Sequence, residues 1–189
     1  GTLAGLAMTR AGRFRGRTVF SGMLAAPLVM PEVITGISLL MLFVSLQELV
    51  GWPGGRGANT ITIAHITFSL AYVAILVQSR LAAMDQSMEE AAMDLGCSPM
   101  RVTFDITLPL IAPAMLSGWL LAFTLSLDDL VIASFVSGPE SSTLPMIIYS
   151  KVKLGITPDI NALATIIVGL VGAGVIVASI VMLRQQRKT

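Results

Sequence analysis

Long apolar runs separated by short polar segments dominate this chain of 189 residues. Four windows, 19–46, 60–77, 108–136 and 162–183, are long enough to cross a hydrocarbon core, which takes about 20 helical residues. The apolar residues 1–9 have the character of the end of a further span rather than of a signal peptide. The pattern therefore predicts an all-α polytopic membrane helix bundle, with four full transmembrane helices and the tail of an earlier one.

Composition supports a membrane protein and narrows its chemistry. Hydrophobic residues make up 54% of the chain and charged residues 12%, about half of the roughly 25% that soluble domains carry. A net charge of +1 argues against a nucleic-acid partner, and the single cysteine excludes an internal disulfide. The sequence holds neither a GxxxxGK[ST] motif nor a nucleophile–base pair. We therefore expect no catalytic residues, no resident cofactor or metal, and no ATP hydrolysis by this chain.

The basic residues predict how the spans are oriented, because cytoplasmic loops are enriched in Lys and Arg. If the predicted spans alternate, nine basic residues fall on one side and three on the other. The loop 80–107 and the C-terminus lie on the richer side, so both are expected in the cytoplasm. That side holds Arg10, Arg13, Arg15, Arg17, Arg80, Arg101, Arg184, Arg187 and Lys188, against Arg56, Lys151 and Lys153.

The segment 87–109 carries an ordered series of helix starts and stops between two apolar windows. Ser87, followed three residues later by Glu90, has the form of a capping box that begins a helix. Gly96 suits the left-handed position that ends a helix, and Ser98–Pro99 begins a second short helix. Pro109 is then expected to redirect the chain into the membrane.

The resulting helix–glycine–helix elbow exposes a small face that is partly apolar and partly acidic. Helices this short are marginal in water, so the elbow needs support from its own spans or from a partner protein. The residues alone leave two interpretations open, an ordinary interfacial connector and a docking element. The exposed face consists of Met88, Ala91, Ala92 and Leu95.

The spacing within the elbow resembles the EAA signature of ABC-importer permease subunits. Glu90-Ala91-Ala92 is followed by Gly96 after three residues and by Ile106-x-Leu108-Pro109 after nine more. In that family the loop is a coupling helix, which seats in a cleft of the cytoplasmic ATPase subunit and transmits its opening and closing. The resemblance implies the same role for the loop 80–107. The residues expected at the ATPase are Glu90, Ala91, Ala92, Leu95, Gly96, Ile106, Leu108 and Pro109.

The resemblance extends over nearly the whole chain, which looks most like the polyamine branch of the family. Three segments carry it, APLVMPEVITGISLL, SLDDLVIASFVSGP and TLPMIIYSKVKLGITPDINALAT, and the last two look closer to the putrescine type. The resemblance implies import of putrescine or spermidine across a bacterial inner membrane. It implies four kinds of partner: a second permease subunit, two ABC ATPase subunits that bind the ATP, a periplasmic polyamine-binding protein and the lipid bilayer. Family members have about six spans, so residues 1–189 are expected to be one permease domain without its N-terminal helices.

Three carboxylates lie within the apolar windows, where a charged side chain usually faces a cavity or a partner. Glu32 directly follows Pro31, which is expected to kink the first window at membrane depth. The alternative is that the span begins near Pro31 and leaves Glu32 at the cytoplasmic interface. Asp128 and Asp129 lie in the third window.

The third window, if it is one helix, places the two aspartates on different faces. Ser117, Thr124 and Asp128 fall on one stripe, which we expect to line the substrate pathway together with Glu32. Asp129 is turned by about 100° and is expected to pair across a helix interface or with Lys151 or Lys153. The alternative for both aspartates is a structural ion pair at the outer interface. An acidic cavity would attract cations such as diamines.

Other functions stay open at this point. A permease of the same family could carry another solute, although the carboxylates argue against an anion. A proton-coupled secondary transporter could use Asp128 or Glu32 as a relay, and a membrane scaffold would transport nothing. His65, the single histidine, is expected to be an interhelical hydrogen-bond partner rather than a proton relay.

Overall fold

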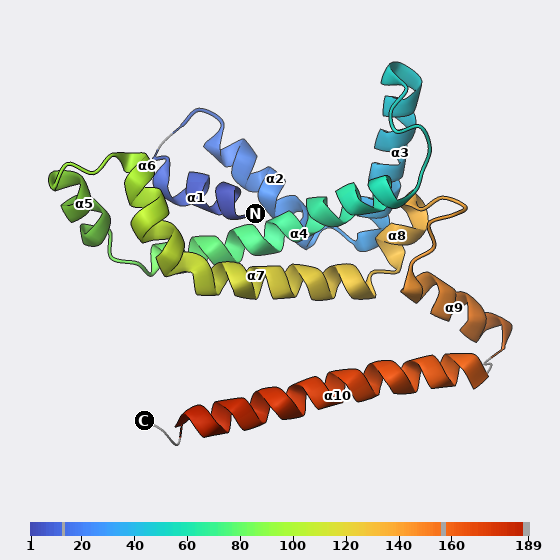
Figure 1. The fold of residues 1–189 in the computed structure, drawn as a ribbon. Helices are drawn as coiled ribbons and strands as arrows, with labels where there is room; N and C mark the ends of the chain where they lie inside the picture. Colours follow the sequence, from blue (N-terminus) through green and yellow to red (C-terminus); the bar gives the residue numbers. More distant parts are fainter. Residues whose placement is uncertain (13, 156–157, 187–189) are drawn as a thin grey trace. The chain divides into compact units, whose positions relative to one another are not determined.

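The computed structural model describes residues 1–12, 14–155 and 158–186, with side chains described up to residue 173. Helices and connecting loops make up the whole of these ranges, which confirms the all-α prediction. The chain divides into two compact units, Gly1–Thr143 and Leu144–Thr189. Figure 1 labels their helices in chain order, and each unit is described by itself.

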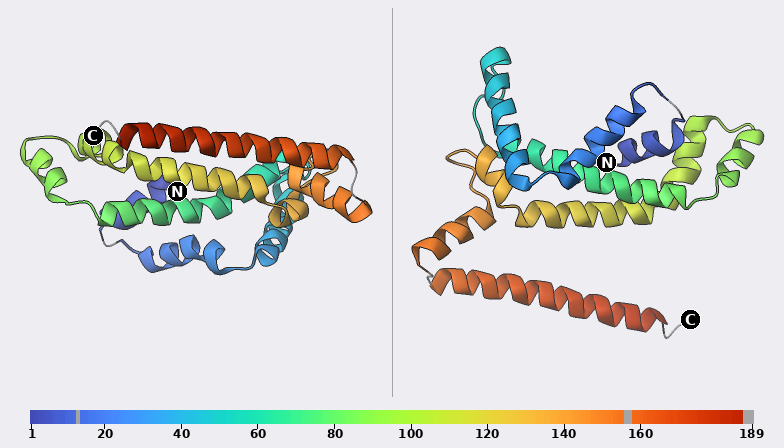
Figure 2. Two further views of the ribbon diagram at one scale, coloured as in Figure 1. Left: turned by 90° about the horizontal axis from the view of Figure 1, so that it is seen from below. Right: turned by 180° about the vertical axis from the view of Figure 1, so that it is seen from behind.

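Helix α4 (Ala58–Ala82) is the central element of the first unit. It packs against α1 (Thr2–Arg10), α2 (Arg17–Val29), α7 (Leu108–Asp128) and α8 (Val131–Val136). Figures 1 and 2 show α4 and α7 side by side along most of their length. A Cβ added to Gly118 of α7 would lie 3.3 Å from Val73 of α4, so the missing side chain allows this close approach.

Two apolar clusters hold α4 to its neighbours, one at each end. Near its start, residues of α4 pack with Leu39 and Phe43 of α3 (Glu32–Val50) and with Ile132 and Val136 of α8. Near its end, Val77 and Leu81 pack with Ile111 of α7. Elsewhere large apolar side chains face outward, as expected for helices whose surroundings are lipid or another membrane subunit. The exposed examples include Met41, Ile66, Trp119 and Phe123.

The first predicted window, 19–46, is not one span. The chain leaves α2 at Val29, passes through Met30 in an extended conformation and begins α3 at Glu32. Pro31 lies at the N-cap of α3, where the missing N–H of proline removes no intrahelical hydrogen bond. Proline therefore separates two helices instead of kinking one, and the prediction of a kinked span is wrong. A helix that begins near Pro31 agrees with the alternative.

The third predicted window, 108–136, is also divided. Helix α7 ends at Asp128, Asp129 has an extended backbone, and α8 follows from Val131. The single helix that we assumed when placing Asp128 and Asp129 on different faces is therefore wrong. An aspartate that accepts backbone N–H groups offers the chain an alternative to continuing the helix, and Asp129 does so here.

Three helices are long and apolar enough to cross a membrane within the described residues: Glu32–Val50, Ala58–Ala82 and the continuous helical stretch Pro99–Asp128. The fourth predicted span, 162–183, lies within α10 (Pro158–Gln186) of the second unit. Its side chains after residue 173 lie outside the described part, as does the structure of residues 187–189. In the same unit α9 (Leu144–Leu154) brings Lys151 to 2.5 Å from Asp159 at the start of α10.

Candidate functional site

The segment that follows α4 forms the predicted elbow. Helix α5 runs from Ser87 to Asp94, and Gly96, two residues further on, has a left-handed φ of +89°. The N–H of Gly96 donates to the carbonyl of Met93 at 2.9 Å, and the N–H of Cys97 donates to that of Ala92 at 3.1 Å. These two bonds form a Schellman motif. The predicted glycine joint is therefore confirmed.

The second half of the elbow also begins as predicted. Ser98 is extended, its Oγ accepts from the N–H of Arg101 at 3.4 Å, and Pro99 occupies the first turn of α6 (Pro99–Val102). The chain continues without a break through one π-helical turn, η1 (Thr103–Thr107), into α7. Pro109 is the second residue of α7, and the chain changes direction where α6 and η1 pass into α7, next to this proline (Figure 1).

The capping box predicted at Ser87 does not form, so this prediction is wrong. Helix α5 begins at Ser87 itself, and its N-cap residue, Gln86, makes no side-chain cap. The backbone N–H of Ser87 instead donates to Oδ1 of Asp85 at 3.0 Å, and this bond lowers the pKa of the Asp85 carboxyl. A carboxylate two residues before a donor is an Asx-turn. The carboxylate of Asp85 thus accepts the N–H that the side chain of Glu90 would have accepted in a capping box.

The residues expected at the ATPase lie mostly on the outside of the elbow. Glu90, Ala91, Leu95, Gly96 and Pro109 are exposed, and Leu95 is 87% accessible. Ala92, Ile106 and Leu108 are half-buried against the rest of the unit. Met88, Met93, Met100 and Phe104 add apolar surface around them. The elbow thus presents a surface rich in methionine, a side chain that adapts to irregular partners.

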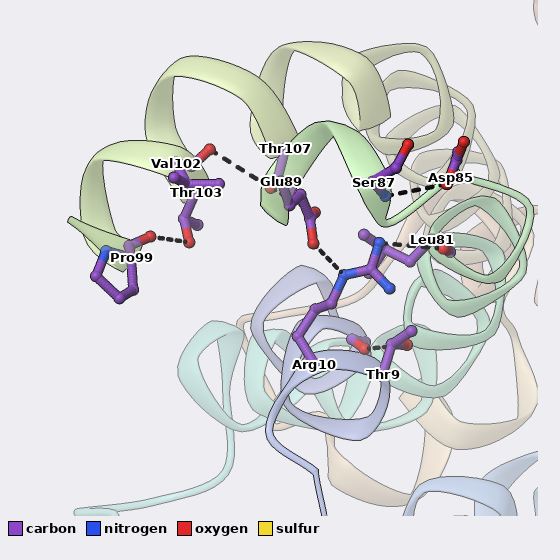
Figure 3. A network of polar contacts seen from close by, with 11 residues as sticks. Thr9, Arg10, Leu81, Asp85, Ser87, Glu89, Pro99, Val102, Thr103 and Thr107 are labelled. Atoms are coloured by element: carbon purple, nitrogen blue, oxygen red, sulfur yellow. Dashed lines mark hydrogen bonds and ion pairs between the residues drawn. The ribbon is translucent and has the colours of Figure 1, made fainter. Parts of the chain in front are cut away.

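The sequence analysis missed Glu89, the immediate neighbour of Glu90. Glu89 is 8% exposed, and its Oε1 accepts from the hydroxyl of Thr107 at 2.8 Å. Its Oε2 lies 2.8 Å from Nε of Arg10, the last residue of α1 (Figure 3). A charged group is rarely this buried unless it is paired. No signal within the elbow itself predicts the pairing with Arg10, because Arg10 lies in α1, far away in the sequence.

At the other end of α7 the three predicted carboxylates come together. Glu32, Asp128 and Asp129 line one cavity of about 280 Å³, together with Thr35 and Tyr72. Helix boundaries explain the meeting, because Glu32 begins α3 while Asp128 and Asp129 end α7. The cavity is somewhat smaller than the roughly 300–1,000 Å³ of drug-sized sites and is large enough for a small cation.

The two aspartates differ in what holds them. Asp129 accepts from the N–H groups of Ile132 at 3.1 Å and Ala133 at 2.8 Å, which caps α8. Its Oδ2 lies 3.0 Å from Nε2 of His65, whose Nδ1 is 2.7 Å from the hydroxyl of Ser126. His65 is therefore an interhelical hydrogen-bond partner, as predicted. Asp128, in contrast, is exposed.

Two further predicted pathway residues do not reach this cavity. The hydroxyl of Ser117 donates to the carbonyl of Pro113 at 2.9 Å, and that of Thr124 donates to the carbonyl of Leu120 at 2.9 Å. Neither side chain lines the acidic cavity. Asp129 pairs with His65 of α4 and so across a helix interface, which is the first of the two predicted alternatives. Within the second unit, Lys151 binds Asp159 and Lys153 lies 5.0 Å from the ring centre of Tyr149.

A larger cavity of about 650 Å³ lies along the α4–α7 pair. His65, Ser69 and Ser126 contribute polar groups to it, and Trp119 and Phe123 contribute aromatic rings. None of its lining residues is acidic. Of these two cavities, only the smaller one offers carboxylates to a cation.

Membrane-length helices joined by an exposed helix–glycine–helix loop are typical of a polytopic membrane protein. A family model described as "Binding-protein-dependent transport system inner membrane component" matches residues 1–189. The chain belongs to this family. It is therefore a multi-pass inner-membrane component of a transport system.

Individual relatives of this chain are permease proteins of polyamine transport systems. The chain is 58% identical over 188 residues to the putrescine transport system permease protein PotI of Escherichia coli strain K12, covering 100% of this chain and 67% of the relative. It is 44% identical over 181 residues to the spermidine/putrescine transport system permease protein PotC of Haemophilus influenzae, covering 96% and 68%. A PotC homolog from Mycoplasma pneumoniae is 35% identical over 166 residues, covering 88% and 56%.

Proposed function

We propose that this chain is the permease subunit of an ATP-driven importer that carries putrescine, and also accepts spermidine, across the bacterial inner membrane. The observation that carries the proposal is the cavity in which Glu32, Asp128 and Asp129 meet. A diamine is positively charged at both ends and needs separated acidic groups. Similarity to the putrescine and spermidine/putrescine permeases supports the same class of substrate.

Within the cavity we assign unequal roles to the carboxylates. Asp129 is occupied by two backbone N–H groups and by His65, so it sets the shape and adds negative potential. Asp128 and Glu32 are exposed and can exchange water for an ammonium group. A charge-assisted hydrogen bond contributes about 1.5–3 kcal/mol, which is enough to bind a substrate and still release it.

The elbow 80–107 is the coupling loop in this proposal, and it lies in the cytoplasm together with the C-terminus. The basic residues support this side, and the exposed Met-rich surface around Leu95 suits a protein partner. Two ATPase subunits bind and hydrolyse the ATP, a second permease completes the pathway, and a periplasmic binding protein delivers the polyamine. Motion of the ATPases against the elbows opens the helices alternately to either side.

Reconstitution of the complete transporter tests the proposal. The assembly of both permeases, the ATPase and the binding protein is placed in proteoliposomes, and uptake of radiolabelled putrescine is measured. Uptake is expected to require ATP, to persist with an uncoupler and to be inhibited by unlabelled spermidine. Uptake that needs no ATP and is abolished by the uncoupler would instead identify a proton-coupled transporter.

Matched variants test the acidic cavity in the same assay. Asp128→Asn and Glu32→Gln are each expected to raise the KM for putrescine about tenfold, which corresponds to about 1.4 kcal/mol. Glu48→Gln is the control, because Glu48 is an exposed acid on the same helix as Glu32 but does not line the cavity. An unchanged KM in both cavity variants would remove these carboxylates from the substrate pathway.

A further inference from the structure

Helix α5 carries the exposed elbow surface, yet its attachment to the rest of the unit is unusual. Glu89 is the single buried residue of this eight-residue helix. A surface helix normally docks through an apolar stripe, whereas the one buried side chain of α5 is a carboxylate. The space beside it is a cavity of about 530 Å³, lined by Leu6, Met93 and Val102 among others. Apolar packing therefore does little to hold α5 in place.

Each oxygen of the Glu89 carboxylate has its own partner. Oε1 accepts from the hydroxyl of Thr107, the residue that immediately precedes α7. Oε2 pairs with Nε of Arg10 at the end of α1. Nη2 of Arg10 in turn donates to the carbonyl of Leu81 in the last turn of α4 at 3.4 Å. In Figure 3 the Arg10 side chain reaches toward Glu89 and Leu81, and Thr107 lies beside Glu89.

Burial separates this cluster from the other ion pair of the elbow. The side chains of Arg10 and Glu89 are 20% and 11% exposed and lie 2.8 Å apart. Those of Arg101 and Asp105 are 72% and 66% exposed and lie 3.7 Å apart. Removing one partner of a buried pair leaves an uncompensated charge, whereas water solvates the charge that remains when an exposed pair is broken. Only the buried pair can resist displacement of α5.

We propose that Arg10, Glu89 and Thr107 form the attachment through which movement of α5 is passed to α1, α4 and the start of α7. The proposal rests on the proposed coupling function of the elbow. In this proposal the three side chains touch neither the substrate nor the ATPase, so they are positioning residues. The adjacent π turn supports it, because π turns are frequent at functional sites in helices.

The test uses the complete transporter in proteoliposomes and measures putrescine taken up per ATP hydrolysed. Thr107→Val removes the hydroxyl at nearly constant volume, and Thr107→Ser keeps it. Glu89→Gln removes the charge and keeps an acceptor for Thr107. Asp105→Asn is the control from the exposed pair. Thr107→Val and Glu89→Gln are expected to lower the uptake per ATP about tenfold, while Thr107→Ser and Asp105→Asn keep the wild-type ratio.

The amount of ATPase that copurifies with each variant separates coupling from docking. It is expected to stay within about twofold of the wild type, because the outward-facing surface is unchanged. A fall in copurified ATPase that accounts for the lost uptake would overturn the proposal, as would a wild-type ratio in Thr107→Val. Thr107→Val decides the matter if Glu89→Gln fails to accumulate.

Failure of the proposed function would look different. If the wild-type transporter does not take up putrescine with ATP, the proposed function is rejected, and the attachment proposal that rests on it is rejected with it. If the wild type does so and Thr107→Val and Glu89→Gln match it, the proposed function stands and the attachment role alone is rejected.

Discussion

The two ends of α7 each carry a pair of adjacent acids, and in both pairs one side chain is largely inaccessible to solvent and paired, while the other acid is exposed. Glu89 and Glu90 lie beside the start of α7, and Asp128 and Asp129 lie at its end. Glu89 is tied to Arg10 and Thr107, and Asp129 is tied to His65 and to two backbone N–H groups. Glu90 and Asp128 are exposed.

The difference between the two pairs lies in what the buried acid holds. Asp129 caps α8 and connects it to α4, so it secures contacts among neighbouring helices. Glu89 attaches a helix that has no other buried residue. Glu89 and Glu90 are adjacent on α5 and point about 100° apart, whereas the chain turns out of α7 between Asp128 and Asp129. In each pair one acid is held by its partners while its neighbour stays available to a ligand or a partner protein. The paired acid is the first of the two at Glu89–Glu90 and the second of the two at Asp128–Asp129.

The largest expected effect is at Asp129. Asp129→Ala leaves the N–H groups of Ile132 and Ala133 without an acceptor and removes the partner of His65, so the free energy of unfolding is expected to fall by about 3 kcal/mol. Unfolding by SDS in mixed micelles measures it. Asp128→Ala, the matched control, is expected to change it by less than about 0.5 kcal/mol. Equal losses in the two variants would end the distinction between these neighbours.

Glu89→Ala is expected to have a smaller effect, about 2 kcal/mol, because its pair with Arg10 is somewhat more exposed than the Asp129 site. Glu90→Ala serves as the control and should be near neutral in the same unfolding assay. Adding Arg10→Ala to Glu89→Ala should cost less than the sum of the single changes, since the double variant leaves no buried charge unpaired. Strict additivity would show that the two side chains do not interact.

The smallest expected effect is at the exposed pair. Asp105→Asn is expected to change the free energy of unfolding by about 0–0.5 kcal/mol, because both side chains of the Arg101–Asp105 pair are well solvated. The change should vanish at about 1 M salt, where the Debye length is about 3 Å. A loss comparable with that of Glu89→Ala would mean that burial does not separate these pairs.

Local signals predicted the elbow well. Gly96 was expected to be left-handed and Ser98–Pro99 to begin a helix, and both are correct because caps depend on a few consecutive residues. The capping box at Ser87 failed for a related reason. Asp85, two residues earlier, accepts the N–H of Ser87 that the capping box would have used.

Apolar runs predicted the helices but not their ends. Windows 19–46 and 108–136 read as continuous because hydropathy does not register a proline at an N-cap or an aspartate that accepts from the backbone. Both breaks lie next to acids, and both place those acids at the same cavity. The acidic cavity was expected from Glu32, Asp128 and Asp129. Ser117 and Thr124 lie on the same helix as Asp128 but do not line that cavity, so their place in the substrate pathway stays a prediction.

The sequence by itself determined the all-α membrane class, the family and the elbow, because apolar length, cap chemistry and motif spacing are local properties of the chain. Tertiary structure alone decided which acid of each pair is buried. Glu89 meets Arg10 across 79 residues and Asp129 meets His65 across 64. Whether a carboxylate is desolvated depends on what packs against it in space, and no pattern within one helix contains that information.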